Sequence, residues 1–379
     1  MKPLSICNYY RNNKKKFISS ILSVFIAVSF LYVLNTFVKS MYDSSYKLGV
    51  IQYKYYSTVK GYNKGNPIPE DIINKLNDDI NVDKLIPFMK YGLRYSTPGS
   101  LNQADVFALR NKDINYFLSK QNTTVTSGRL PSENKHEIAV NYPVAQNKKI
   151  KIGDSVGNEV NKFEELNGKY KVVGILKGET MMSIVSANNE TFPTKDSGED
   201  IMRNGIMIFP KMGKASEVNK IIESLPRDEV QSETINSVSK QFTDQMGALR
   251  ILDIVSILAI VLMVITVGSS KYVQFFNRKE ELGILNAIGY DKSYILKRAI
   301  LEVVIVNSIS YIIGILLGIA LSYMNKMNIF EAAGAVGVVL YSKAFIVSLY
   351  VPLFTILFTI IPINIMINKL DPIKMIENN

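Results

Sequence analysis

The sequence predicts an α-helical membrane protein with four transmembrane helices and a large extracytoplasmic α+β domain inserted between helices 1 and 2. Three observations predict this fold. The apolar residues, 47% of the 379, concentrate in four runs, a long segment of mixed pattern separates the first run from the second, and Lys and Arg flank the runs unevenly. The predicted spans are residues 17–38, 251–270, 299–324 and 345–367, and the inserted domain is 39–250.

Each run is long enough to cross a bilayer. A helix rises about 1.5 Å per residue, so roughly 20 residues span a hydrocarbon layer of about 30 Å. Lipid offers no partner to backbone amides, so such runs must be helical. The charged residues within the runs are two carboxylates, Asp253 and Glu302. The first run follows basic residues as a signal peptide does, but its apolar part exceeds the usual roughly 7–15 residues, so we interpret it as an uncleaved span.

Charge predicts the orientation. Residues 1–16 contain five basic residues and no acid, and the linker 271–298 contains six basic residues and three acids. Short loops rich in Lys and Arg stay in the cytoplasm. We therefore expect the tails 1–16 and 368–379 and the linker to be cytoplasmic, with the inserted domain and the short loop 325–344 outside. This bias accounts for much of the formal charge of +11, which needs no nucleic acid as partner.

Several classes of site are excluded by composition. Cys7 is the only cysteine and His136 the only histidine, which excludes a disulfide scaffold and a multi-histidine zinc site. The pattern G-x-x-x-x-G-K-[ST] is absent, so this chain cannot hydrolyse ATP by a P-loop mechanism. We predict no metal, no cofactor and no catalytic residue in this chain, and His136 is interpreted as a surface residue.

The inserted domain mixes helical and strand patterns. Residues 69–80 and 214–226 have helical spacing, while 104–110, 169–178 and 204–210 read as strands. The intermixing of the two patterns predicts an α+β domain, and the polar stretch 186–200 predicts a mobile loop.

The ends of the inserted domain carry a heptad-like pattern. Apolar residues recur every three or four positions before the second span, and Leu34, Val38, Met41 and Leu48 do the same after the first. This spacing predicts stalk helices that continue out of the membrane, ordinary amphipathic packing being the alternative. The predicted stalk residues are Ile235, Val238, Phe242, Met246 and Leu249.

A compact charged segment, "RKEELGILNAIG" (residues 278–289), lies between the second and third spans. Wound as a helix, it places Leu282, Ile284, Leu285 and Ile288 in one arc, with Gly283 and Ala287 together on another. Gly289 is a natural helix stop, and Asp291 can cap the next helix. The pattern predicts a docking helix for a cytoplasmic partner, and the alternative is a helix lying on the lipid surface.

This segment resembles the coupling segment of the FtsX/MacB-type ABC transporter permeases, approximately R-x-x-E-[IL]-G-[IL]-L-[RK]-A-[LI]-G. Asn286 and Tyr290 depart from the pattern. A looser resemblance covers the outer domain, and the closing stretch "PINIMINKLDPIKMIEN" is similar to the end of these permeases. The matching residues are Arg278, Glu281, Leu282, Gly283, Ile284, Leu285, Ala287, Ile288 and Gly289 in the segment, and Glu302, Gly314, Gly318 and Pro362 in the spans.

The resemblance implies the partners. Such permeases work as dimers, so we expect a homodimer or pseudo-dimer in a bacterial cell membrane. A separate cytoplasmic ABC ATPase, carrying ATP and Mg, would dock on residues 278–289, and an extracytoplasmic adaptor would be a further partner. Gly314 and Gly318 form a G-x-x-x-G pattern suited to close helix packing. Glu302 would either bond the docking helix or extend to the membrane surface.

Three functions remain open at this point. The first is a mechanotransmission permease that exports or expels a peptide, antibiotic, toxin or lipid-linked substrate. The second is an FtsX-like subunit that regulates a cell-wall hydrolase, although outer domains of that type are generally smaller. The third is a membrane receptor that works without ATP, which would have no use for a docking helix.

Overall fold

The computed structural model describes residues 10–62, 67–97, 100–187 and 205–368. The chain divides into two compact units. The helical unit comprises Met1–Lys39, Ala248–Lys326 and Val338–Asn379, and the sheet unit comprises Ser40–Gly247 and Met327–Gly337. We describe each unit by itself.

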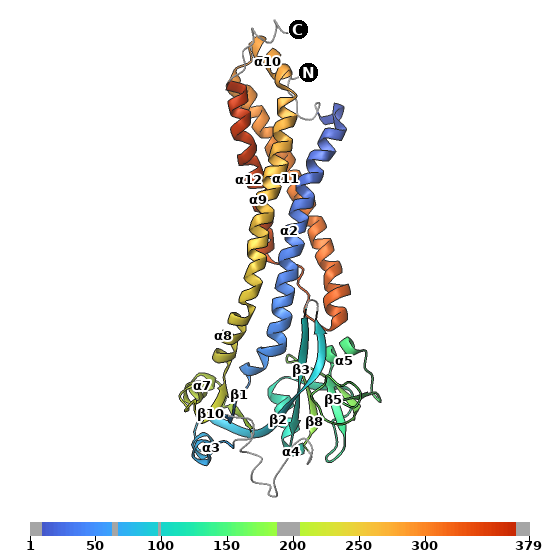
Figure 1. Cartoon of the computed structure of the whole chain (residues 1–379), viewed down its shortest axis with the longest axis vertical. Helices are drawn as coiled ribbons and strands as arrows, with labels where there is room; N and C mark the ends of the chain where they lie inside the picture. Colours follow the sequence, from blue (N-terminus) through green and yellow to red (C-terminus); the bar gives the residue numbers. More distant parts are fainter. Residues whose placement is uncertain (1–9, 63–66, 98–99, 188–204, 369–379) are drawn as a thin grey trace. The chain divides into compact units, whose positions relative to one another are not determined.

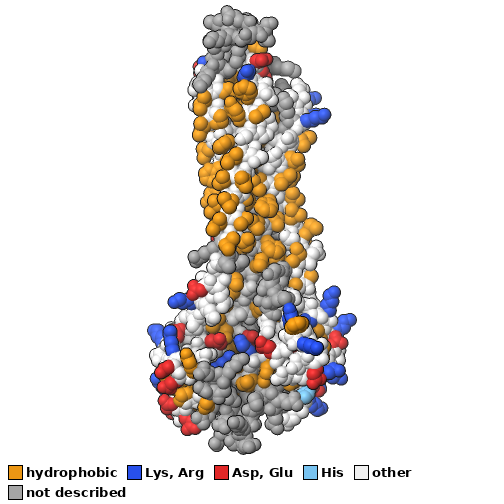
Figure 2. Space-filling view, in the orientation of Figure 1, with side chains coloured by type: hydrophobic (Ala, Val, Ile, Leu, Met, Phe, Trp, Pro, Cys, Tyr) orange, Lys and Arg blue, Asp and Glu red, His pale blue; other side chains and the backbone are white. Residues whose placement is uncertain are grey.

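Four long apolar helices run alongside one another in the helical unit (Figure 1). All four are long and apolar enough to cross a membrane. Hydrophobic side chains cover much of their outer surface, as Figure 2 shows, which is the arrangement expected of helices that face lipid. The predicted fold class is confirmed, with the inserted domain between the first and second helix. The four helices are α2 (Lys14–Gly49), α9 (Arg250–Phe276), α11 (Lys292–Asn325) and α12 (Ser342–Asn368).

Small residues allow α11 to approach α2 closely. A Cβ atom at Gly314 would come within 2.8 Å of the Val28 side chain, and one at Gly318 within 2.9 Å of Tyr32. Ser29 Oγ donates a hydrogen bond of 2.9 Å to the carbonyl oxygen of Gly314. The G-x-x-x-G pattern therefore serves a helix contact within this chain. The α12 helix carries Pro352 and Pro362 in its interior.

The sheet unit is built on a mixed sheet, which within the described residues has ten strands. Nine strands follow the order β10-β1-β9-β2-β3-β8-β5-β7-β4, and β6 pairs with β7. Most neighbouring strands are antiparallel, while β3 with β8 and β5 with β7 are parallel. The strands are β1 (Ser57–Gly61), β2 (Val82–Thr97), β3 (Ser100–Leu109), β4 (Thr124–Gly128), β5 (Glu137–Asn141), β6 (Ser155–Val156), β7 (Tyr170–Lys177), β8 (Met182–Ser186), β9 (Gly205–Pro210) and β10 (Val230–Glu233).

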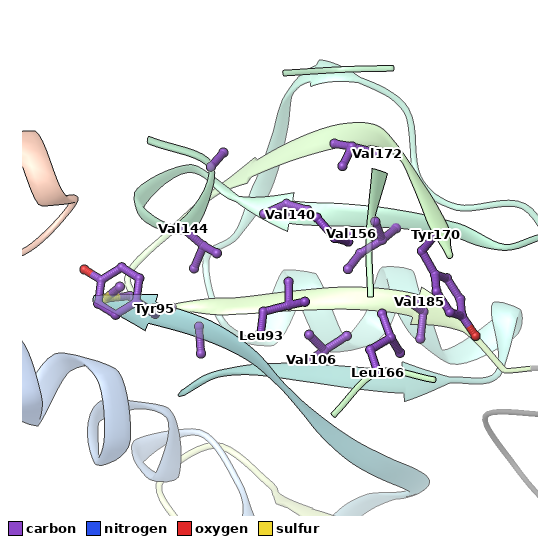
Figure 3. Close-up of a cluster of buried hydrophobic side chains, with 14 of the residues drawn as sticks. Leu93, Tyr95, Val106, Val140, Val144, Val156, Leu166, Tyr170, Val172 and Val185 are labelled. Atoms are coloured by element: carbon purple, nitrogen blue, oxygen red, sulfur yellow. The ribbon is translucent and has the colours of Figure 1, made fainter. Parts of the chain in front are cut away.

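Helices in the sheet unit cover separate parts of the core. The strands β2, β3, β5, β7 and β8 contribute to the cluster in Figure 3, where Val106, Val140, Val172 and Val185 point toward one another. A second cluster is rich in aromatic side chains, and a third lies beneath α3 and α7. The helices are α3 (Glu70–Asn77), α4 (Asn111–Lys120), α5 (Tyr142–Lys148), α7 (Ala215–Glu223) and α8 (Ile235–Gln245).

The sequence patterns of the inserted domain correspond to these elements. The helical patterns at 69–80 and 214–226 form α3 and α7, and the three strand patterns form β3, β7 and β9. Most of the predicted loop at 186–200 lies outside the described residues. His136 is exposed directly before β5, and its ring packs 5.0 Å from that of Tyr170.

The turn between α11 and α12 belongs to the sheet unit. It contains the π-helix η3 (Lys326–Phe330) and the 3-10 helix η4 (Glu331–Ala333). Asn147 Nδ2, at the end of α5, donates to the carbonyl oxygen of Ala333 at 2.9 Å. Ser44 Oγ in α2 accepts from the Val336 amide at 2.9 Å. The third and fourth spans are therefore joined by a turn that is hydrogen-bonded to the outer domain.

The predicted heptad-like contact between the two stalk helices is partly formed. In the sheet unit, the ring of Phe242 on α8 packs edge-on against Tyr42 and Tyr46 of α2, with centroids 5.0 and 5.6 Å apart. The expectation of one unbroken helix into the second span is wrong, because the 3-10 helix η2 (Met246–Leu249) separates α8 from α9. Gly247 lies in this segment and lowers helix stability by about 1 kcal/mol relative to Ala.

Candidate functional site

The short helix α10 (Lys279–Ala287) lies at one end of the helical bundle (Figure 1). Glu280 and Glu281 occupy its first turn, where negative charge complements the helix dipole. Gly289 has φ of +104°, and the Tyr290 amide donates to the Leu285 carbonyl at 3.1 Å. Such a left-handed glycine closes a helix, as the sequence predicts. Asp291 takes the N-cap position of α11 without a side-chain capping bond.

A buried ion pair ties the start of α10 to α11. The Arg278 guanidinium donates from Nη1 to Glu302 Oε2 at 2.9 Å and to Oε1 at 3.2 Å. Tyr10 Oη donates to Glu302 Oε1 at 2.7 Å. Glu302 therefore bonds Arg278, at the start of the segment 278–289, and does not extend to the surface. Arg278 also contacts the exposed carboxylate of Glu281 at 3.1 Å, although only 8% of the Arg278 side chain is exposed.

Apolar contacts hold the inner side of α10. Leu282 is 2% exposed and packs in a cluster with Phe275, Ile295, Ala299 and other residues of α11 and α12. Leu285 is partly buried against the same cluster, and Gly283 is also buried. The side chain of Leu282 and the Arg278 ion pair thus fix α10 to the bundle at two points.

The outer side of α10 is open. Ile284 is 52% exposed and Ile288 is 71% exposed, and Ala287 and Gly289 are exposed beside them. The predicted arc therefore divides: Leu282 and Leu285 serve the internal packing, while Ile284 and Ile288 are available to a partner. Gly283 is buried and therefore lies on the inner side of α10.

Two residues at this site were not predicted from the sequence. Lys271 is 2% exposed, because α9 continues past residue 270 to Phe276. The spacing of Val264, Val267, Lys271 and Phe275, every three or four residues, signals an inward-facing lysine. Tyr10 had no such signal, since its partner Glu302 is 292 positions away.

A second polar network, partly buried, lies in the sheet unit. Tyr53 Oη donates to Glu233 Oε2 at 2.6 Å, and Thr58 Oγ1 donates to the same oxygen at 3.0 Å. Gln52 Nε2 donates to Asp105 Oδ2 at 2.8 Å. Gln52 and Tyr53 lie in the 3-10 helix η1 (Ile51–Lys54), directly after α2, and Glu233 lies directly before α8. The network therefore joins both stalk ends to the sheet.

The electrostatics of this network favour the charged forms of Glu233 and Lys90. Burial by itself would raise the pKa of Glu233, but the Tyr53 hydrogen bond and the Lys60 and Lys90 ammonium groups hold it below its usual value. Burial lowers the pKa of Lys60. Burial acts in the same direction on Lys90, but the Asp105 and Glu233 carboxylates outweigh it and raise the pKa. The two carboxylates and two lysines compensate one another.

The remaining predicted residues have simpler environments. Ile235 and Val238 pack partly against the aromatic cluster of the sheet unit, and Met246 is half-buried. The side chain of Leu249 lies outside the described residues, as do Cys7 and most of the closing motif after Pro362. Among the described residues, no group of three His, Cys, Asp or Glu side chains is placed to hold a metal ion.

Comparison with known proteins gives two kinds of match at the sequence level. Residues 254–372 match the model of the FtsX-like permease C-terminal domain. An uncharacterized ABC transporter permease of Methanocaldococcus jannaschii is 27% identical over 215 residues, 52% of this chain and 51% of that protein. The putative hemin transport system permease protein HrtB of Staphylococcus epidermidis is 23% identical over 245 residues, 64% of this chain and 63% of that protein.

Solved structures give weak likenesses. The periplasmic region of MacB from Actinobacillus actinomycetemcomitans has a TM-score of 0.29 at 11% identity, covering 50% of this chain and 92% of that one. The extracellular domain of YknZ from Gram-positive bacteria has a TM-score of 0.27 at 14% identity, covering 47% and 100%. These TM-scores add nothing to the assignment, which rests on the family model and the sequence relatives. The matched segments span about half to two thirds of those relatives, and residues 254–372 of this chain are similar to the C-terminal domain of FtsX-like permeases.

Proposed function

We propose that this chain is the membrane subunit of a mechanotransmission ABC transporter, in which a separate cytoplasmic ATPase docks on α10 and drives motion of the outer domain. The observation that carries the proposal is the construction of α10. Its inner side is fixed by Leu282 and the buried Arg278–Glu302 pair, while Ile284 and Ile288 on its outer side are exposed. A helix held so firmly on one side can pass a push on its other side to the bundle.

The exposed side of α10 fits a protein partner. Two large aliphatic side chains flank a small residue, Ala287, and a few such anchors carry most of the energy of an interface. The side chain of Glu281, half exposed, provides a charge beside them. ATP and Mg would be bound by the partner, because this chain has no P-loop.

Charge supports the orientation that this function needs. The basic residues of 1–16 and 271–298 favour a cytoplasmic position for both termini and α10, with the sheet unit outside. The assembly would contain two permease subunits in a bacterial cell membrane, as a homodimer or pseudo-dimer, with an extracytoplasmic adaptor as a further partner.

Three connections can transmit motion to the outer domain. The first is α2, which continues from the helical unit into the sheet unit, and the second is the chain from α8 through η2 into α9. The third is the turn between α11 and α12, hydrogen-bonded to Asn147 and Ser44. The network of Tyr53 and Glu233 stiffens the point where the first two connections enter the sheet.

The spans favour handling of the substrate outside the bilayer. Residues 254–270, 303–325 and 344–368 contain no Asp, Glu, Lys or Arg. A charge at mid-membrane costs roughly 2.5–3.5 kcal/mol on translocon scales, so a hydrophilic substrate would find few partners there. The proposed substrate class is therefore a peptide, antibiotic, toxin or lipid-linked molecule expelled from the outer leaflet or the outer surface.

Topology can be tested by labelling single cysteines in a Cys7-free chain. A cysteine at Lys148 should react with an impermeant reagent in intact cells, and a cysteine at Asn286 should react only after lysis. Equal labelling of the two positions in intact cells would contradict the proposed orientation.

Docking can be tested by purifying the native complex. The wild-type chain should bring down an ABC ATPase, and Ile288→Asp should lose it. Met212→Asp is the matched control, because Met212 is fully exposed on the sheet unit and should leave the ATPase bound. A Gly-Gly insertion after Phe242 should keep the ATPase and abolish the transport output. Co-purification of a cell-wall hydrolase would favour the regulatory role, and absence of any ATPase would favour a receptor.

A further inference from the structure

Lys271 is an unusual residue for its position. Its side chain is 2% exposed inside an apolar helical bundle. In the part of the chain that the structure describes, no hydrogen bond or ion pair to its ammonium group is present. Buried lysines are rare unless they are paired, and ionisable residues within membrane spans are commonly functional.

The carboxylate that acts electrostatically on Lys271 is that of Glu302. Lys271 and Arg278 lie seven positions apart along the chain, two helical turns or roughly 10 Å. Lys271 lies with the buried Val264, Val267 and Phe275 on the side of α9 that faces the bundle, and Arg278 follows the end of α9 at Phe276 by two residues. Glu302 is bonded to Arg278, and its charge also acts on the buried Lys271, so the two cations share one carboxylate as their electrostatic partner.

The two cations are attached to different elements. Arg278 is the N-cap residue of α10, whereas Lys271 lies within the continuous helix α9. Any displacement of α10 would therefore move Arg278 and leave Lys271 in place. A carboxylate left without a cation in this apolar surrounding would be strongly unfavourable.

We propose that Lys271 is a positioning residue, the second cation partner of Glu302, which takes the carboxylate when α10 moves and Arg278 withdraws. The inference rests on the proposed function in one respect: the ATPase is what would displace α10. Exchange of Glu302 between two cations gives the bundle two discrete arrangements of similar energy, the property that switching elements require.

The test is a double-mutant cycle on the complete chain in lipid nanodiscs without ATPase. Arg278→Met alone should lower the thermal unfolding midpoint modestly, because Lys271 compensates the carboxylate. Lys271→Met alone should change the unfolding midpoint little, and the double variant should lower it by more than the sum of the two single changes. Arg278→Met combined with Lys271→Arg should behave like Arg278→Met, because the cation is kept.

Matched controls isolate the carboxylate. Lys343→Met removes a cation from the exposed pair with Asp253 and should be additive with Arg278→Met. In a Glu302→Gln background, the excess loss from combining Lys271→Met with Arg278→Met should disappear. If the double variant does not accumulate, membrane yields are compared instead, and the Arg278→Met, Lys271→Arg chain must still accumulate.

Two results would overturn the inference: additive losses for Lys271→Met and Arg278→Met, or an excess loss that persists with Glu302→Gln. The cycle contains no ATPase, so its outcome is independent of docking. If no ATPase purifies with the wild-type chain, the proposed function is contradicted, even when the double-mutant cycle shows an excess loss of stability. If the double-mutant cycle shows only additive losses, the proposal of ATPase docking is unaffected.

Discussion

Two glutamates, the buried Glu302 in the helical unit and the partly buried Glu233 in the sheet unit, differ in how their charge is balanced. Both accept a hydrogen bond from a tyrosine: Glu302 from Tyr10 at 2.7 Å and Glu233 from Tyr53 at 2.6 Å. In the sheet unit, two carboxylates, Glu233 and Asp105, and two lysines, Lys60 and Lys90, lie on strands of the sheet. In the helical unit, the single carboxylate of Glu302 is bonded to Arg278 and acts electrostatically on Lys271.

The charged groups around Glu233 are therefore fixed in place, whereas in our proposal Glu302 can exchange one cation partner for another. In the sheet unit, the four charged residues of the network lie on strands that are hydrogen-bonded to their neighbours, which fixes their backbone positions in the sheet. In the helical unit, Arg278 is attached to a short helix at the end of the bundle, and a spare cation remains if it leaves. Four predictions sharpen or break this comparison, in order of decreasing effect.

The largest effect is expected for Glu302→Ala. It leaves Arg278 and Lys271 as uncompensated buried cations, and breaking a buried ion pair typically costs about 3–5 kcal/mol. Thermal unfolding of the complete chain in nanodiscs measures the loss. Asp253→Ala is the control, because its pair with Lys343 is exposed and such pairs contribute about 0–1 kcal/mol. Equal losses for the two variants would show that the buried interactions of Glu302 contribute no more to stability than the exposed pair of Asp253 and Lys343.

Gly334→Val should release the turn between α11 and α12 from the outer domain. Gly334 has φ of +67°, and an added Cβ would come 2.2 Å from the Pro143 carbonyl oxygen. Strain of this kind costs about 1–3 kcal/mol. Hydrogen exchange of the α5 amides should accelerate, while that of α3 stays unchanged. Unchanged exchange in α5 would mean that the turn does not depend on this contact.

Tyr53→Phe should weaken the polar network around Glu233 and leave the packing of the aromatic ring unchanged. The variant keeps the ring and removes one hydrogen bond to Glu233, whose oxygen Oε2 retains the bond from Thr58, so we expect a loss of about 0.5–1.5 kcal/mol. The control is Tyr55→Phe, since the hydrogen bond of Tyr55 to Glu179 is exposed. Chemical denaturation should separate the two variants, and an equal response would argue against a special role of the buried network.

The smallest effect concerns Glu137 in β5. Hydrogen bonds from Arg129, at 2.6 and 2.7 Å, hold the pKa of Glu137 at about 2, below the ordinary 4.5. Because this pKa is lowered in the folded state, the stabilisation is complete above pH 4.5 and is lost as the pH falls toward 2. Exchange of the β5 amides, measured against Glu137→Gln at each pH, should differ at pH 6 and converge near pH 2. A constant difference would contradict the assignment.

Much of the fold could be predicted because its signals are local. The length of an apolar run determines whether a helix can span a bilayer. Within the inserted domain, a short apolar run indicates a strand such as β7, and apolar residues every three or four positions indicate a helix such as α3. The interruption at η2 was not predicted, since Gly247 lowers helix stability but does not by itself decide between α and 3-10 geometry.

The candidate site was predictable in part for the same reason. Winding 278–289 as a helix identified the short element and its end at Gly289. It could not show that Leu282 and Gly283 face the bundle while Ile284 and Ile288 face outward. The spacing of apolar residues in one arc does not indicate which surface each residue contacts. The buried face depends on the neighbouring helices, which lie far away in the sequence.

The sequence by itself determined the four spans, the charge bias across them, the inserted α+β domain and the short helix α10, since each follows from composition and periodicity within a few turns of chain. Only the tertiary structure decided which groups meet. Tyr10 reaches Glu302 across 292 positions, Tyr53 reaches Glu233 across 180, and Lys271 faces the interior because α9 continues to Phe276. Contacts between distant residues depend on how packed helices and strands place them, and no local pattern specifies that placement.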